Sequence, residues 1–138
     1  MPSKTLCIMV GLPRSGKSTT AKQTGFPIVS VDAIQYAMCG KHMKPLYEFH
    51  EMSDTYAKYM IKSLFLAGHD DVVYDACNHL ESRRDYWANW CNEHAYGYVF
   101  TLVDTPMEVC QDRAKGFKNA DWLIPRIEEM AFEFDEVK

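Results

Sequence analysis

The chain has 138 residues, of which 47% are hydrophobic and 25% are charged, proportions that are typical of one globular domain and exclude a disordered chain. The net charge of −4 argues against a strongly basic nucleic-acid-binding surface. Five cysteines without CxxC spacing predict reduced thiols and a cytoplasmic protein. No segment reaches the ~20 apolar residues of a membrane span, so no membrane contact is expected.

Short apolar runs alternate with helical patterns along the chain. The runs at 5–10, 27–32, 71–76 and 98–104 predict strands of a parallel sheet. Helices are predicted over 16–24, 33–40, 47–67, 81–94, 106–115 and 122–134. The helix over 47–67 would direct an apolar stripe into the core, formed by Tyr56, Tyr59, Met60 and Leu64. This alternation predicts a single α/β domain over 1–138, with its ligands at the carboxyl ends of the strands.

The segment "GLPRSGKST" (11–19) is the strongest motif of the sequence. It follows a predicted buried strand and begins a predicted helix, which is the setting of a phosphate-binding P-loop. In such a loop the backbone N–H groups bind phosphate oxygens, the lysine reaches the β- and γ-phosphates, and the serine hydroxyl binds Mg²⁺. The predicted nucleotide-binding residues are Gly11, Pro13, Arg14, Ser15, Gly16, Lys17, Ser18 and Thr19.

Polar side chains at two other strand ends are candidates for roles beside the P-loop. Asp32 ends the second run and begins a helix, so it either caps that helix or acts as a general base toward an acceptor hydroxyl. Asp75 ends "VVYD", and we predict that it holds Mg²⁺ together with Ser18. Asn78 follows shortly after and is expected beside the same site, in contact with the substrate.

Basic residues supply three further candidates, and solvated surface charge is the alternative for each. Arg84 lies in the first turn of a predicted helix, where the helix dipole disfavours cations, so we predict a contact with phosphate. Lys41 belongs to a basic loop that would contact the substrate. Arg113 and Lys115 predict a lid, at about 113–121, which brings cations over the transferring phosphoryl group.

The segments "GLPRSGKST", "VSVDAIQYAM", "AGHDDVVYDACNHLESRR" and "VDTPMEVCQDRAKG" together resemble the P-loop kinases of the 5′-hydroxyl polynucleotide kinase type. The resemblance implies a P-loop NTPase fold with four to five parallel strands in the order of the nucleoside monophosphate kinases. It implies that the Asp75 strand lies beside the P-loop strand. It also implies ATP and Mg²⁺ as cofactors, with Lys17 and Ser18 in the phosphate and metal roles and Asp32 as the general base.

Three positions depart from the pattern of these kinases. Cys77, in "DACN", stands where they more commonly have a threonine. Gln35 stands where they have an arginine that grips the phosphate of the acceptor. Phe117 stands where they have a second lid arginine, four residues after Arg113. Lys115 or Lys118 would replace that arginine as a point charge, without its bidentate geometry.

These residues predict a Mg²⁺-ATP-dependent kinase whose acceptor is a hydroxyl, in the first place the 5′-hydroxyl of a polynucleotide or nucleotide. The predicted catalytic residues are Lys17, Asp32, Arg113 and Lys115. The predicted substrate contacts are Asp32, Gln35, Lys41, Asn78 and Arg84. One alternative is a kinase for a nucleoside or another small metabolite, which Gln35 and the acidic net charge favour. Another is a regulatory protein that binds ATP without catalysis, which the missing lid arginine favours.

Overall fold

The computed structural model describes residues 3–40 and 47–137, and its centre is a sheet of four parallel strands in the order β2-β3-β1-β4. The strands are β1 (Thr5–Val10), β2 (Ile28–Ser30), β3 (Asp71–Asp75) and β4 (Gly97–Leu102). Cys7 of β1 pairs with Val73 of β3 on one side and with Val99 of β4 on the other. The predicted α/β P-loop NTPase fold is thereby confirmed, with the Asp75 strand beside the P-loop strand.

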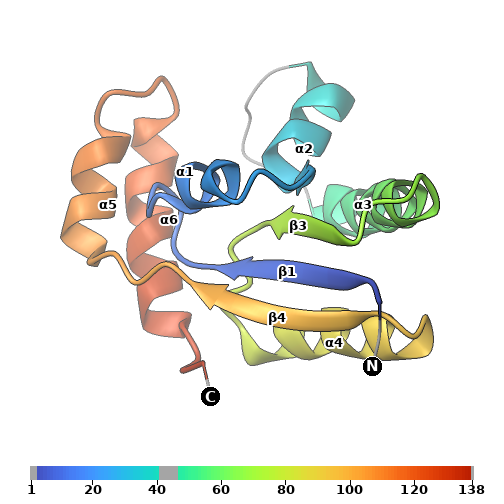
Figure 1. Cartoon of the computed structure of the whole chain (residues 1–138). Coiled ribbons are helices and arrows are strands. Elements are labelled where there is room, and N and C mark those ends of the chain that lie inside the picture. Colours follow the sequence, from blue (N-terminus) through green and yellow to red (C-terminus); the bar gives the residue numbers. More distant parts are fainter. Residues whose placement is uncertain (1–2, 41–46, 138) are drawn as a thin grey trace.

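Helices connect and flank the strands, with bounds close to those predicted. In the described part of the chain they are α1 (Lys17–Gln23), α2 (Val31–Cys39), α3 (Tyr47–Leu66), α4 (Glu81–Glu93), α5 (Met107–Ala114) and α6 (Ala120–Glu133). The strand arrows point toward the end of the sheet at which α5 and α6 lie (Figure 1). Nowhere in 3–40 or 47–137 does a helix combine the length and the hydrophobicity of a membrane span.

Strand β2 is shorter than predicted because its last residue caps the next helix. Ser30 has extended backbone angles, and its Oγ accepts a hydrogen bond of 3.2 Å from the Ala33 N–H. A serine in this place satisfies one of the free N–H groups in the first turn of the helix. Asp32 therefore lies inside the first turn of α2 and is not its cap.

The two faces of the sheet are covered unequally. On one face, Leu6, Ile8 and Tyr74 pack with residues of α2, α3 and α4, and the rings of Tyr74 and Trp87 lie 4.3 Å apart between centroids. Full burial of such large side chains stabilises the fold by about 1.5–3 kcal/mol each. The opposite face has a small cluster around Met9, where α1 covers the strands.

The predicted core stripe of α3 is wrong for most of its members. Tyr59 is 67% exposed and Tyr56 is 51% exposed, and Met60 is also exposed, whereas Leu64 is half-buried against the core. The buried face of α3 consists instead of Ser53, Asp54, Ala57, Ile61 and Phe65. Small side chains on that face let the helix approach the sheet, and a partly buried ion pair of 2.7 Å between Asp54 and Arg83 joins α3 to α4.

Candidate active site

The P-loop connects β1 to α1, and its backbone has the conformation that phosphate binding requires. Gly16 has φ 102°, and Arg14 has φ 64°, so both lie in the left-handed region. A Cβ at Gly11 would lie 2.8 Å from Ser15 Oγ and 2.9 Å from the Val103 carbonyl oxygen, so only glycine fits there. Arg14 is not a glycine, and its left-handed backbone costs about 1–2 kcal/mol. The P-loop is therefore tightly curled, and at Gly11 it packs closely against the segment that follows β4.

Lys17 begins α1 and folds back over the P-loop. Its Nζ donates a hydrogen bond of 2.7 Å to the Leu12 carbonyl, and the residue is only 8% exposed. An ammonium group has three donors, and this bond uses one of them. A buried cation with unused donors in a curled glycine loop is suited to binding phosphate oxygens.

Ser18 and Asp75 meet across two chain segments that are distant in sequence. The Ser18 hydroxyl donates a hydrogen bond of 2.7 Å to Oδ2 of Asp75, which is buried at the end of β3. Mg²⁺ is held in proteins by one or two such oxygen groups together with substrate phosphates. The described residues contain no group of three or more His, Cys, Asp or Glu side chains that would form a metal cage of their own. The pair therefore fits a Mg²⁺ ion that is shared with a nucleotide.

Ser15 carries an unpaired polar atom inside the P-loop, which also fits the binding of a phosphate. Its Oγ is buried and has no hydrogen-bond partner, and a buried hydroxyl without a partner is costly. Its carbonyl accepts a hydrogen bond of 2.6 Å from Thr105 Oγ1, which ties the loop to the segment after β4. Thr105 could not be predicted from the sequence, because its role depends on a contact between residues 90 positions apart.

The predicted lid brings one of its two predicted cations to the P-loop. Arg113, in the last turn of α5, donates a hydrogen bond of 3.1 Å to the Arg14 carbonyl. Lys115 instead forms an exposed ion pair of 3.3 Å with Asp112. The structure therefore supports the placement of Arg113 but gives Lys115 no contact with the phosphate-binding loop.

Asp32 lies in the first turn of α2. It is exposed, and it forms no hydrogen bond or ion pair within 3–40 and 47–137. Burial raises the pKa of the Cys77 thiol, the Lys17 ammonium opposes that rise, and the carboxylates of Asp32 and Asp75 add to it. All three charged groups lie near enough to Cys77 to influence the pKa of its thiol. Gln35 is half-buried one turn further along α2, and Lys41 lies outside the described residues.

The structure corrects the prediction for Arg84. Its guanidinium is 4% exposed and donates to the carbonyls of Asn78, His79, Asp135 and Glu136 at 2.9–3.1 Å. Its donors are engaged by the backbone, so Arg84 fastens the C-terminal segment to the start of α4 instead of contacting a substrate phosphate.

Asn78 also has a structural position. It is buried, has φ 48°, and donates 2.9 Å from Nδ2 to the Met9 carbonyl. Asparagine tolerates this left-handed backbone better than most residues. It bridges β1 and the turn after β3, so its side-chain amide supports the P-loop strand and is not directed at a substrate.

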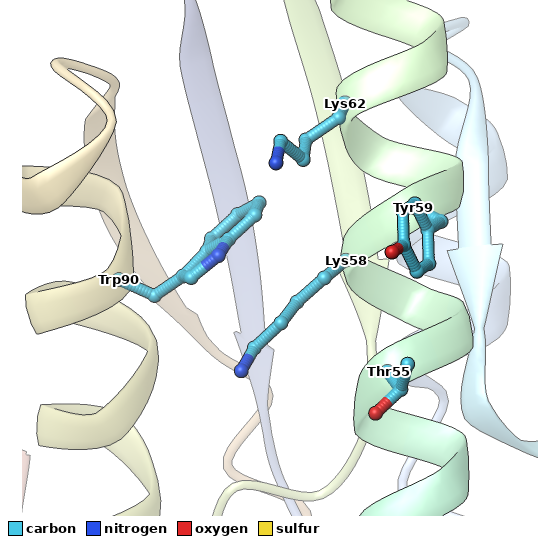
Figure 2. Close-up of a pocket in the computed structure, with 5 residues that line it drawn as sticks. All are labelled: Thr55, Lys58, Tyr59, Lys62 and Trp90. Carbon is cyan, nitrogen blue, oxygen red and sulfur yellow. The ribbon is translucent and has the colours of Figure 1, made fainter.

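A separate surface pocket lies between α3 and α4, and none of the predicted site residues lines it (Figure 2). It is lined by Thr55, Lys58, Tyr59, Lys62 and Trp90. Lys58 Nζ donates a hydrogen bond of 2.5 Å to the Tyr86 hydroxyl. The long stems of the two lysines lie beside the buried Trp90, an arrangement in which alkyl chains shield an aromatic ring while the ammonium groups stay in water.

A family model described as an AAA domain matches residues 6–121. The chain belongs to this family. The matched range contains the P-loop, Asp32, Asp75 and the predicted lid. A comparison with curated protein sequences finds no match.

Solved structures with the same fold include kinases. A chain of the Pnkp1/Rnl/Hen1 complex is 25% identical with a TM-score of 0.62, and the match covers 82% of this chain and 40% of that one. A gluconokinase from Sinorhizobium meliloti 1021 is 17% identical with a TM-score of 0.58, covering 98% and 76%. The APS kinase CysC of Mycobacterium tuberculosis, solved with AMPPNP and APS, is 17% identical with a TM-score of 0.59, covering 86% and 72%. The chain spans less than half the length of the Pnkp1/Rnl/Hen1 complex chains that it matches.

Proposed function

We propose that this chain is a Mg²⁺-ATP-dependent kinase that transfers the γ-phosphoryl group to an acceptor hydroxyl. The main support is the P-loop, which brings Lys17 together with the hydrogen-bonded pair of Ser18 and Asp75, and the exposed, unpaired carboxylate of Asp32 in the first turn of α2. A general base must be free to accept a proton, and a carboxylate engaged in capping or in an ion pair would not be. Since Ser30 caps α2, Asp32 is free for this role.

In this proposal each side of the site has its own task. The backbone N–H groups of the P-loop, Lys17 and Arg113 bind the phosphates and stabilise the charge that spreads over the transferring group. Asp32 accepts the proton of the acceptor hydroxyl while the new O–P bond forms and the bond to the ADP oxygen breaks. Mg²⁺, when bound, neutralises phosphate charge, and Ser18 and Asp75 would hold it.

We infer that the acceptor is the 5′-hydroxyl of a polynucleotide or nucleotide. The support is the match of motifs to the 5′-hydroxyl polynucleotide kinase type and the 25% identity with a chain of the Pnkp1/Rnl/Hen1 complex. Gln35 supports a second candidate, a kinase for a small metabolite, because a neutral amide there grips an acceptor phosphate less strongly than an arginine. Phe117 supports a third, an ATP-binding regulator, because it removes a cation from the lid.

An acceptor panel with γ-labelled ATP tests the function. The panel contains 5′-hydroxyl oligonucleotides, nucleosides, nucleoside 3′-phosphates and sugar acids, and each is tested with the wild type, Lys17→Ala and Lys22→Ala. We expect label on a 5′-hydroxyl acceptor with the wild type and with Lys22→Ala, which removes an exposed lysine of the same helix. Lys17→Ala should lower transfer by about 10³-fold. Tight ATP binding without labelled product in any arm would contradict the kinase proposal.

Salt dependence separates the two acceptor classes. Each phosphate contact of a polynucleotide releases counterions, so its affinity should fall steeply as salt is added. A small neutral acceptor should show little change. A KM for the labelled oligonucleotide that stays constant between about 50 and 200 mM salt would contradict the polynucleotide proposal.

A further inference from the structure

The side chain of Arg14 has a position that its membership of the P-loop does not explain. The P-loop needs only the backbone of this residue, and a glycine would adopt its φ of 64° without strain. Its guanidinium carbon lies 3.4 Å from the centroid of the Phe117 ring, a close cation–π stack. In the described part of the chain this guanidinium donates no hydrogen bond and forms no ion pair. The stack fixes the plane of the group and leaves its N–H donors available at the edges.

The partner ring belongs to the predicted lid. Phe117 lies in the turn between α5 and α6, where its N–H bonds to the Ala114 carbonyl and its carbonyl accepts from Ala120, both at 3.1 Å. The ring is therefore carried by a defined turn. Phe117 also occupies the position, four residues after Arg113, at which the resemblance places the second lid arginine.

Two arginines from different segments, Arg14 and Arg113, meet where the P-loop lies beside α5 and the turn that follows it. Arg113 donates to the carbonyl of Arg14, and the guanidinium of Arg14 lies on Phe117, so Arg14 contacts both α5 and the turn that follows it. Lys115 is paired with Asp112 on the surface. Lys118 is exposed and forms no hydrogen bond or ion pair with the described residues.

We propose that Arg14 supplies the second cation of the lid from the P-loop itself, with Phe117 as the platform that orients it, and that its guanidinium binds the terminal phosphate of the nucleotide. In the polynucleotide kinase pattern the second arginine stands on the lid. In this chain the arginine stands in the P-loop, and the lid carries the aromatic ring that orients it. A guanidinium beside a triphosphate offers two parallel N–H donors, which a lysine cannot offer. This inference rests on the proposed function, because it assumes that ATP is the nucleotide held by the loop.

The test measures binding of ATP and ADP separately, without an acceptor, for Arg14→Ala, Arg14→Lys, Phe117→Leu and the double variant Arg14→Ala/Phe117→Arg. Arg14→Ala should weaken ATP by about tenfold or more and ADP by much less, because only ATP has the terminal phosphate. Arg14→Lys and Phe117→Leu should give intermediate losses. The double variant should recover most of the ATP preference, since it returns the arginine to the lid. Arg126→Ala, which removes an arginine paired on α6, is the matched control.

The outcomes separate this inference from the proposed function. Unchanged ATP and ADP affinities in folded Arg14→Ala would overturn the inference, as would a double variant that binds ATP no better than Arg14→Ala. A wild type with the expected ATP preference and no phosphoryl transfer to any acceptor would contradict the proposed function alone. A wild type that binds neither nucleotide would overturn both.

Discussion

The two halves of the candidate site differ in how the protein holds them. On the donor half, Lys17, Ser18 and Arg113 all hydrogen-bond to other protein groups, at 2.7–3.1 Å. On the proposed acceptor half, the side chains of Asp32 and Gln35 form no hydrogen bond with the described residues. A nucleotide would therefore meet a preorganised cradle, whereas the acceptor itself must supply the partners on its side. Changes on the donor half should affect nucleotide and metal binding, and changes on the acceptor half should affect acceptor binding and turnover while nucleotide binding is retained.

After Lys17→Ala, the largest effect on the donor half is expected from Asp75→Asn. The amide keeps the shape of the side chain but removes the charge that faces Ser18 and the metal. We expect the Mg²⁺ requirement to rise and transfer to fall by about 10–100-fold, the range found when groups that support a metal site are changed. A Mg²⁺ titration of phosphoryl transfer measures this. Asp85→Asn, at an exposed position on α4, should leave the curve unchanged. The same curve for Asp75→Asn and the wild type would remove Asp75 from the site.

A second change, Arg84→Ala, tests whether Arg84 is a structural residue and not a substrate contact. Arg84→Ala leaves four backbone carbonyls without their buried partner, so it should lower the free energy of unfolding by about 3–5 kcal/mol. Urea denaturation measures the loss, and Arg126→Ala should cost about 1 kcal/mol or less because its ion pairs are more exposed. At low temperature, transfer per folded molecule should match the wild type. Wild-type stability with a raised KM for the acceptor would restore Arg84 as a substrate contact.

Lys115→Gln examines the part of the lid that does not reach the P-loop. Its ion pair with Asp112 is exposed, and such pairs contribute about 0–1 kcal/mol. Steady-state kinetics should give transfer within about twofold of the wild type, since the side chain touches no phosphate-binding group. A tenfold loss of kcat with unchanged stability would mean that Lys115 belongs to the catalytic group after all.

The smallest expected effect is a pH dependence of stability away from the site. Burial lowers the pKa of His79 below its ordinary value of 6.5, against the opposing effect of Glu133, which lies 3.5 Å away. The unfolded chain then binds the proton more readily than the folded chain. The contribution of His79 to the free energy of unfolding is therefore complete above about pH 6.5 and declines as the pH falls below it. Urea unfolding at several pH values should show this decline, and His79→Gln should flatten it. An unchanged slope in His79→Gln would assign the decline to other groups.

Much of the donor half could be predicted because its information is local. The glycines, lysine and serine of residues 11–19 occur in one segment, and the strand and helix around them follow from apolar periodicity. Element bounds agreed within about two residues for the same reason. The partner strand of the P-loop was inferred from the family resemblance, and the sheet order confirms it.

The errors arose where a contact between distant segments decides the outcome. Asp54 is buried in α3 because Arg83 of α4 pairs with it, which rotates the tyrosines of α3 toward solvent. Arg84 is structural because residues 135 and 136 return to it from the end of α6. Neither pairing can be read from periodicity along one helix. The stack of Arg14 on Phe117 belongs to the same class, since it joins residues that only the fold brings together.

The most direct measurement of the central claim is the comparison of Asp32→Asn with the wild type, on the best acceptor of the panel. Asparagine has nearly the same shape but cannot accept the proton, so we expect kcat to fall by about 10²–10⁴-fold. The Kd for ATP should stay within about twofold, because Asp32 lies on the acceptor half and bonds to none of the phosphate-binding groups. Wild-type turnover in Asp32→Asn, or an equal loss of ATP affinity and turnover, would contradict the separation of the site into a donor half and an acceptor half.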